Sequence, residues 1–267
     1  MQPLNRSQFA LPEFKNPPVS EVACGATFVP LKQFTTAHGG LYWSRIRGDF
    51  PETEHATPLS TPGQGWFDPK LGLPLPRQWF ISKDKQGLIQ LQGDCLFFNW
   101  RRVADTDLYP RYATVIENYK KYLATFLELL RDLAIPTPGV TGCELTYVNH
   151  IPQEHGWKSV HDLAVVFHDL HWRDRTGRFL PVPTNIVWKM DFPLPTTGTL
   201  TVSLARATRV KDQMPTLKLD LTARAAFQEV KFDDIWPWFD MAHEWIVRGF
   251  ADLTQEEIQD KVWKRTK

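Results

Sequence analysis

Five of the eight histidines in this sequence lie between His150 and His171, and closely spaced histidines are candidate metal ligands. Two or three imidazoles that converge on one point hold a transition metal at about 2.1 Å. His168 and His171 have the i, i+3 spacing that brings two side chains to one face of a helix. His161 lies two turns from His168, too far to share the ion. Because no HExxH or CxxC pattern supports the cluster, we expect no metal and no cofactor, and an enzyme with a site near these histidines is kept as an alternative.

A second candidate for chemistry is the pair His243 and Glu244, within the run "AHE". General acid–base catalysis needs two groups within hydrogen-bond reach of each other. Adjacent residues on a helix point about 100° apart, so this pair is poorly placed to form a dyad. We therefore expect His243 to bond a group on a facing element and to serve packing or ligand binding. No residue is assigned a catalytic role.

Large aromatic and basic residues in the expected loops are candidates for recognition. Exposed aromatic side chains commonly mark binding surfaces, and arginine beside tryptophan suits protein, phosphate or nucleic-acid contact. The candidate interaction surface consists of Trp66, Phe67, Trp172, Arg173, Arg175 and Arg178. The chain has no GxGxxG, GxxxxGK[ST] or GxSxG motif, which disfavours hydride transfer, phosphoryl transfer and hydrolysis.

Composition narrows the class of protein further. The net charge is only +1, which argues against a dedicated duplex-DNA binder. No apolar run reaches the roughly 18 residues of a membrane span, so we expect no membrane partner and a cytoplasmic location. Cys24, Cys95 and Cys143 each lie in an apolar, strand-like run, which predicts buried, reduced thiols.

The first half of the sequence, residues 1–136, shows the pattern strand, short helix, hairpin, long helix. Residues 19–31 alternate as a strand does, and the apolar residues at 41–50 indicate a short helix. Residues 52–76 are rich in proline, threonine and glycine, which predicts a long irregular loop with Trp66 and Phe67 near its middle. After a hairpin at 77–102 comes the clearest helix, with apolar residues at 3-and-4 spacing.

The second half, residues 137–267, repeats this order. A strand at 139–152 precedes a short helix at 157–167 with Ser159 as its N-cap. Three strands then lead to a final helix, and Thr254 with Glu257 predicts a capping box for a second one. We therefore expect an α+β fold in which two pseudo-repeated β-α-β-β-α halves build an antiparallel sheet, with long helices packed on one face in a single compact unit.

Two stretches carry a resemblance to a known family. The strand containing "PPVSEV" and the helix "AHEWIVRGFADLT" resemble the two ends of a sporadically distributed bacterial family with no established reaction. The resemblance spans nearly the whole chain and implies a gene carried on mobile or defence-related genome segments. The element order is also similar to that of GyrI-like small-molecule-binding modules.

These observations favour a non-enzymatic protein-interaction module, a component of a bacterial defence or toxin–antitoxin-like system whose partner is another protein. The alternative is a small-ligand sensor with an aromatic-lined cleft between the two halves. The residues expected to line that cleft are Trp79, Trp100, Trp188, Trp245 and His243. Nucleic acid is a further candidate partner through the arginine–tryptophan stretches.

Overall fold

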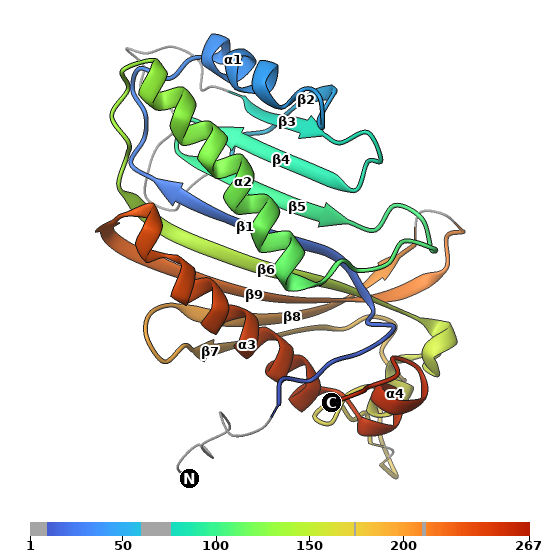
Figure 1. Cartoon of the computed structure of the whole chain (residues 1–267). Helices are drawn as coiled ribbons and strands as arrows, with labels where there is room; N and C mark the ends of the chain where they lie inside the picture. The colour runs from blue at the N-terminus through green and yellow to red at the C-terminus, as the bar shows by residue number, and fades with distance from the viewer. Residues whose placement is uncertain (1–9, 60–75, 174, 210–211) are drawn as a thin grey trace. The chain divides into compact units, whose positions relative to one another are not determined.

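The computed structural model of the chain describes residues 10–59, 76–173, 175–209 and 212–267. These residues form an α+β fold built on antiparallel strands, which confirms the expected fold class at that level (Figure 1). The strands are β1 (Val19–Phe28), β2 (Glu52–Ala56), β3 (Arg77–Ile81), β4 (Gly87–Gln92), β5 (Cys95–Arg101), β6 (Val140–Pro152), β7 (Val187–Pro193), β8 (Thr199–Thr208) and β9 (Pro215–Val230). The α-helices are α1 (Thr36–Ile46), α2 (Arg111–Asp132), α3 (Trp236–Leu253) and α4 (Glu256–Lys261), and the 3-10 helices are η2 (Gln153–His155), η3 (Val160–Val165) and η4 (Phe232–Asp234).

Hydrogen bonds join the described strands into a 9-stranded sheet of order β2-β3-β4-β5-β1-β6-β9-β8-β7. In the antiparallel pairs, Cys24 of β1 lies opposite Phe98 of β5, and Phe98 lies opposite Ile89 of β4. Successive residues of a strand point to opposite faces of the sheet. This register therefore fixes which side chains can share a site.

The chain divides into two compact units. Unit 1 comprises Met1–Ser20, Tyr147–Ala223 and Asp240–Lys267, and unit 2 comprises Glu21–Thr146 and Arg224–Phe239. Strands β1, β6 and β9 each contribute residues to both units. The sequence halves 1–136 and 137–267 divide the chain differently, and the pseudo-repeat inferred from the element order stays a prediction.

The core of unit 2 is built around helix α2. Most of the apolar residues predicted at 3-and-4 spacing are buried on this helix, which explains why it packs on the sheet, although Tyr112 is only half-buried. Phe126 is 0% exposed, and its ring lies 5.9 Å from the ring of Phe28 on β1. It also lies 5.9 Å from Phe34 and 5.7 Å from Tyr42 on α1. The helix thereby fixes β1 and α1 through one aromatic cluster.

In unit 1, the part of α3 that follows Asp240 packs on its strands through Ala242, Ile246 and Phe250, all buried. Phe14 and Phe250 form an edge-to-face pair with ring centroids 5.5 Å apart. Backbone hydrogen bonds, such as that from Lys15 N–H to Lys264 O at 3.0 Å, join the residues before β1 to those after α4.

Two expected elements differ in the structure. Residues 52–56 of the expected loop form strand β2, which pairs with β3 although most of its residues are exposed. A charged sheet-edge strand of this kind has no apolar alternation to reveal it. Residues 60–75 lie outside the described residues. The expected helix at 157–167 is the 3-10 helix η3, and Ser159 caps it as predicted, accepting from His161 N–H at 3.2 Å.

All three cysteines are buried and none forms a disulfide, as expected. Burial raises the pKa of each thiol far above its ordinary value. None of the helices in the described part of the chain is long and apolar enough to span a membrane.

Candidate functional site

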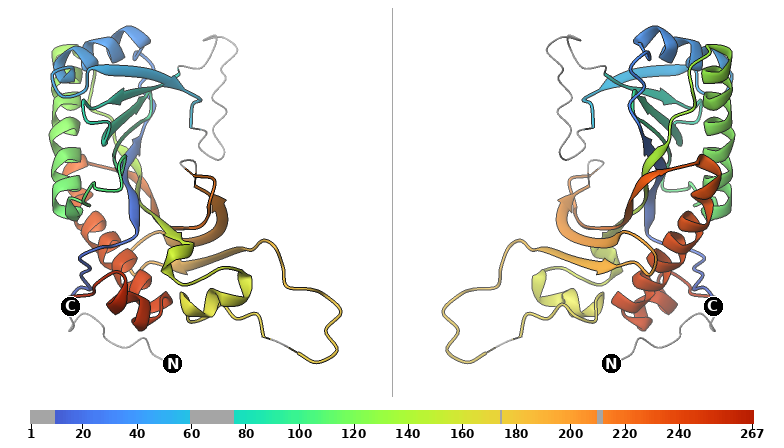
Figure 2. Two further views of the ribbon diagram at one scale, coloured as in Figure 1. Left: turned by 90° about the vertical axis from the view of Figure 1, so that its right-hand side faces the viewer. Right: turned by 90° about the vertical axis from the view of Figure 1, so that its left-hand side faces the viewer.

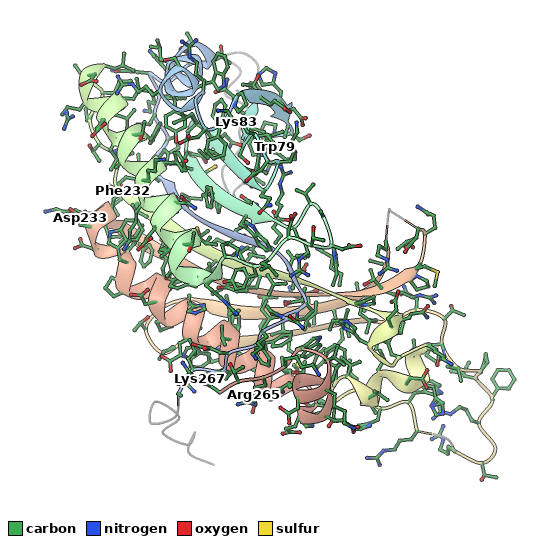
Figure 3. The ribbon with its side chains drawn as sticks, turned by 45° about the vertical axis from the view of Figure 1, so that its right-hand side comes forward. Trp79, Lys83, Phe232, Asp233, Arg265 and Lys267 are labelled. Carbon is green, nitrogen blue, oxygen red and sulfur yellow. The ribbon has the colours of Figure 1, made fainter. Side chains whose placement is uncertain are left out.

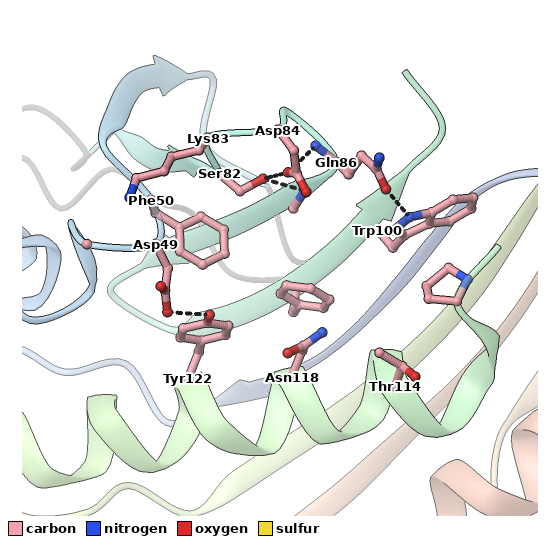
Figure 4. Close-up of a pocket in the computed structure, with 14 residues that line it drawn as sticks. Asp49, Phe50, Ser82, Lys83, Asp84, Gln86, Trp100, Thr114, Asn118 and Tyr122 are labelled. Atoms are coloured by element: carbon pink, nitrogen blue, oxygen red, sulfur yellow. Dashed lines mark hydrogen bonds between the residues drawn. The ribbon is translucent and has the colours of Figure 1, made fainter. Parts of the chain in front are cut away.

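Unit 2 contains a pocket of about 370 Å³ between helix α2 and the turn that joins β3 to β4 (Figure 4). Four aromatic rings and a set of polar side chains surround it, the mixed lining that is typical of small-molecule sites. The lining residues are Gly48, Asp49, Phe50, Ser82, Lys83, Asp84, Gln86, Gly87, Phe98, Trp100, Pro110, Thr114, Asn118 and Tyr122.

Helix α2 supplies one wall of the pocket. Thr114, Asn118 and Tyr122 are spaced four residues apart, so they lie along one side of the helix and point toward the pocket (Figure 4). Asn118 is half-buried. In the part of the chain that the structure describes, its carboxamide makes no hydrogen bond.

The β3–β4 turn supplies the opposite wall and is held by its own side chains. Asp84 Oδ1 accepts from Ser82 Oγ at 2.5 Å and from Gln86 N–H at 3.0 Å. Lys85 has a φ of 64°, the left-handed conformation that closes this turn. The hydrogen bonds from Ser82 and from the turn backbone lower the pKa of Asp84, so this carboxylate is charged and committed to the turn.

The floor of the pocket is aromatic. Trp100 is buried, and its Nε1–H donates to Gln86 Oε1 at 3.1 Å. Phe98 stacks on Tyr122 with ring centroids 6.0 Å apart, and Phe50 meets Tyr122 edge-on at 4.9 Å. The rings therefore support one another, and the indole fixes the orientation of the Gln86 amide.

One end of the pocket carries opposite charges. Asp49 Oδ2 accepts from Lys121 Nζ at 2.9 Å and from the Tyr122 hydroxyl at 3.1 Å. These hydrogen bonds lower the pKa of Asp49, and nearby Lys83 adds to the effect. Burial raises the pKa of Tyr122, so its hydroxyl stays protonated and can donate. Within the described ranges, no carboxylate lies close enough to Lys83 Nζ to form an ion pair.

Of the residues expected to line a ligand site, only Trp100 lies in this pocket. Trp79 lies opposite Gln90, whereas Trp100 lies opposite Gly87, and the alternation along β4 puts the two indoles on opposite faces of the sheet. Figure 3 shows Trp79 on β3, before the turn that carries Lys83. The two indoles therefore do not line the same pocket.

Trp79 belongs instead to a polar network on the other face of the sheet in unit 2. The Arg77 guanidinium lies 5.4 Å from the Trp79 ring centroid, and Arg77 Nη1–H donates to Gln90 Oε1 at 2.9 Å. Gln90 Nε2–H donates to Asn99 Oδ1 at 2.8 Å, and Asn99 Nδ2–H donates to Glu21 Oε1 at 2.5 Å. Burial lowers the pKa of Arg77, which still leaves it charged at neutral pH.

Trp188, Trp245 and His243 belong to unit 1. Trp188 lies opposite Leu204 on β8 and its ring is 6.5 Å from that of Phe167. Trp245 is half-buried on α3. The ligand-binding role assigned to these residues stays a prediction.

His243 contacts Tyr147, in agreement with the expectation that it bonds a facing element. Its Nδ1 lies 3.0 Å from the Tyr147 hydroxyl, and the two rings stack at 5.9 Å. Glu244 instead accepts from Arg248 Nε–H at 2.7 Å. Burial lowers the pKa of His243 to about 4, against a weaker opposite effect of Asp240 and Glu244, so the imidazole is neutral at pH 7.

This shifted pKa predicts a stability change with pH. The unfolded chain binds a proton at His243 near its ordinary pKa, whereas the folded chain binds it only near pH 4, so unfolding is favoured as the pH falls. We expect the wild type to lose roughly 2–3 kcal/mol more stability between pH 7 and pH 4 than a His243→Gln variant, which cannot titrate. Urea unfolding across this pH range measures the difference.

The comparison between variants is needed because Asp94 acts in the opposite direction. Burial raises the pKa of Asp94 to about 6, so its contribution to stability falls as the pH rises toward 6. If the free energy of unfolding changes equally with pH in the wild type and in His243→Gln, the folded chain does not protect His243 from protonation.

The histidine cluster does not form a metal site in the described part of the chain, where no group of three or more histidine, cysteine, aspartate or glutamate residues could hold an ion. His155 Nδ1 accepts from Trp263 Nε1–H at 3.3 Å. His161 Nδ1 lies 3.1 Å from Trp172 O, and His168 Nε2 lies 3.4 Å from a Glu256 carboxylate oxygen.

The candidate interaction surface is partly described. Trp66 and Phe67 lie outside the described residues. In unit 1, the Arg178 guanidinium lies 4.0 Å from the Trp172 ring centroid, and Arg178 Nη2–H donates to Arg173 O at 2.7 Å. Figure 2 shows this segment extending away from η3 and β7, the elements on either side of it in the chain. We call residues 172–173 and 175–186 the arginine loop.

Sequence reasoning missed the apolar residues of this loop. Phe179 is 96% exposed, and Leu180 is 61% exposed. It also missed most of the pocket, including Asn118 and Lys83. The only signal for Asn118 is its position one helical turn before Tyr122, beside the apolar stripe of α2.

No protein-family description matches this sequence, and no curated protein matches it either. The fold and the site define the chain as an α+β protein with an antiparallel sheet, a mixed aromatic and polar pocket beside α2, and an exposed arginine loop.

Proposed function

We propose that the protein is a non-enzymatic interaction module that docks a partner protein through the arginine loop. The observation that carries this proposal is the exposure of Phe179, at 96%, together with that of Leu180 in the loop and of Val187 at the start of β7. Large apolar side chains at a projecting surface lose contact with water on docking, which is why aromatic residues dominate binding energy at interfaces. Exposed apolar residues that are grouped, as Phe179 and Leu180 are, commonly mark protein-interaction sites.

Charge supports a particular kind of partner. Arg173, Arg175 and Arg178 precede the apolar residues Phe179 and Leu180, and Arg178 is oriented by its contacts with Trp172 and the Arg173 carbonyl. Arginine forms bidentate pairs with carboxylates and is enriched at protein interfaces. The partner surface that suits this loop is an apolar patch bordered by aspartate and glutamate.

The biological setting is proposed on the resemblance of the strand and helix signatures. On that resemblance we propose that the module acts in a bacterial defence or toxin–antitoxin-like system. The buried, unpaired cysteines support a cytoplasmic location, where thiols stay reduced. The element order supports the finer proposal of two pseudo-repeated halves with their long helices on one face of the sheet.

The test is co-purification of the full chain from its native host, followed by an affinity measurement with the purified partner. We expect Phe179→Asp to weaken partner binding at least tenfold, the typical effect of losing an aromatic anchor residue. The matched control is Leu108→Asp, because Leu108 is also a large exposed side chain, at 80%, but lies outside the arginine loop.

Three outcomes would contradict this proposal. One is equal partner affinity of the wild type and Phe179→Asp at unchanged melting temperature. Another is loss of binding in Leu108→Asp to the same degree. The third is recovery of RNA or DNA, with no protein, as the bound molecule, which would assign the arginines to phosphate contact.

A further inference from the structure

Strand β7 lies at the end of the sheet, and one of its two edges has no neighbour among the described strands (Figure 1). On its other edge it pairs with β8 in a regular antiparallel register. Its residues alternate in exposure: Val187, Lys189, Asp191 and Pro193 are exposed, and the residues between them are half-buried. An open sheet edge is a template to which a further strand can add.

The backbone groups on this open edge belong to the exposed residues. Directly after β7, Leu194 N–H donates to Gly198 O on the β8 side at 3.1 Å. Because backbone groups alternate in direction along an antiparallel strand, Met190 bonds toward β8, whereas Lys189 and Asp191 direct their N–H and C=O groups outward. In the described part of the chain, no hydrogen bond reaches these outward groups. They can therefore bond one further strand.

The sequence of β7, VWKMDFP, is complementary to itself when two copies run antiparallel about Met190. In that register Lys189 lies opposite Asp191 of the second copy, and two-fold symmetry repeats the pair. Opposite charges directly across two strands attract, and like charges repel. A shift of two residues in either direction would place Lys189 opposite Lys189 or Asp191 opposite Asp191. The charges thus favour one register.

Both charged groups are available for this pairing. Lys189 forms no ion pair and no side-chain hydrogen bond within the described residues. Asp191 accepts from the Thr201 hydroxyl at 2.6 Å through Oδ1, which orients the carboxylate and leaves Oδ2 for the lysine of a second copy.

The other face of the paired strands would join apolar residues. Trp188, Met190 and Phe192 lie opposite residues of β8 that are at most 2% exposed, so they continue the core of unit 1 to the sheet edge. In the self-paired register Trp188 lies opposite Phe192 of the second copy, and Met190 lies opposite its own counterpart. These are non-hydrogen-bonded pairs, in which side chains come closest, and aromatic pairs of this kind stabilise a sheet.

We propose that two copies of this chain associate through β7, which joins their sheets in an antiparallel register centred on Met190. Charged residues on a sheet edge also serve to keep unrelated strands away. Here the two charges have opposite signs and stand symmetrically about Met190, so they match a second copy of the same strand. All of β7 lies outside the arginine loop, so this association does not depend on the proposed docking function.

The first experiment is sedimentation velocity of the full chain from about 1 to 300 μM. An interface of one strand from each copy is small, so we expect a dimer with a dissociation constant of about 10 μM. Lys189→Asp and Asp191→Lys each create like-charge pairs across the interface and are expected to weaken the dimer at least about tenfold. The matched control is Lys32→Asp, which changes the net charge equally at an exposed lysine outside β7 and retains wild-type association.

Restoring the charge pairs distinguishes this interface from a general effect of charge. The double variant Lys189→Asp/Asp191→Lys again places opposite charges across the strands, so its dissociation constant is expected to return to within about threefold of the wild-type value. A mixture of the two single variants is expected to form a dimer with one copy of each, because every cross-strand pair in it has opposite charges.

Disulfide cross-linking tests the register. Met190→Cys brings two thiols to the two-fold axis, where the Cα atoms of a non-hydrogen-bonded pair are about 4.5 Å apart, a distance that a disulfide spans. Val187→Cys is the control, because Val187 is 72% exposed but would lie about 20 Å from its counterpart. The native cysteines are buried and do not compete. We expect a reducible dimer from Met190→Cys alone.

Several results would overturn this proposal. A chain that stays monomeric at about 300 μM would remove it, as would wild-type association of both single charge variants. A double variant that stays monomeric, or Val187→Cys that cross-links as fast as Met190→Cys, would exclude the register. Phe179→Asp, which tests the arginine loop, is expected to leave the dimer unchanged, so the two proposals can fail separately.

Discussion

Replacing Ala242 with glutamate is expected to lower the melting temperature of the protein by on the order of 10 °C. Ala242 is 0% exposed and lies on the buried side of α3. A glutamate there would place a charge, and a larger side chain, in a packed interior with no partner to receive it. An unpaired buried charge costs several kcal/mol of folding free energy.

The next two residues provide the matched controls on the same helix. Glu244 is partly exposed and pairs with Arg248 one turn away, so Glu244→Ala is expected to cost only about 0.5 kcal/mol. His243→Ala removes the contact with Tyr147 and is expected to cost about 1–2 kcal/mol. Thermal unfolding of the three variants gives the order of their melting temperatures. A wild-type melting temperature for Ala242→Glu would contradict the orientation of α3.

The helices could be predicted because the residues that each helix buries lie close together in the sequence. The 3-and-4 spacing of apolar residues on α2 and α3 identifies the side that packs, and the structure buries most of those positions. Strand β2 was not predictable in this way, since its residues are mostly exposed and its pairing with β3 is a long-range event.

Thr254 shows that a sequence pattern typical of a helix cap does not always form one. Thr254 and Glu257 match the capping-box pattern, yet α4 begins after Gln255 with no side-chain cap. Thr254 is 0% exposed, and its hydroxyl donates to Phe250 O at 2.8 Å. Burial of the junction between α3 and α4 decides the partner of this hydroxyl, and the tetrapeptide pattern contains no information about burial.

The site was the least predictable part, for a similar reason. The sequence indicates tryptophans as ligand residues by their type alone, but the strand register puts Trp79 and Trp100 on opposite faces of the sheet. The pocket combines a helix wall, a turn and the connection after α1, and only the fold brings Asp49, Lys83 and Asn118 to one place. None of these three has a neighbour in sequence that marks it as functional.

Replacing Phe126 with alanine is expected to be the most destabilising truncation in unit 2, at about 3–5 kcal/mol. Phe126 is fully buried, and its ring contacts Phe28, Phe34 and Tyr42, which come from β1, from the segment before α1 and from α1 itself. The variant loses the transfer free energy of the ring and leaves a cavity among three elements. Because the backbone of a strand lines this cavity on one side, the surrounding side chains cannot move in to fill it completely.

Urea unfolding of Phe126→Ala, Phe126→Leu and Glu128→Ala tests this account. Glu128 is exposed on the same helix, so its replacement by alanine removes no core contact and should change stability by no more than about 0.5 kcal/mol. Phe126→Leu fills most of the cavity and should lie between the other two variants. If Phe126→Ala costs no more than Glu128→Ala, the aromatic cluster does not hold α2 to β1 and α1. Other contacts would then hold α2 in its position beside the pocket. The next candidate is the hydrogen bond from the Tyr42 hydroxyl to Tyr122 O, at 3.0 Å.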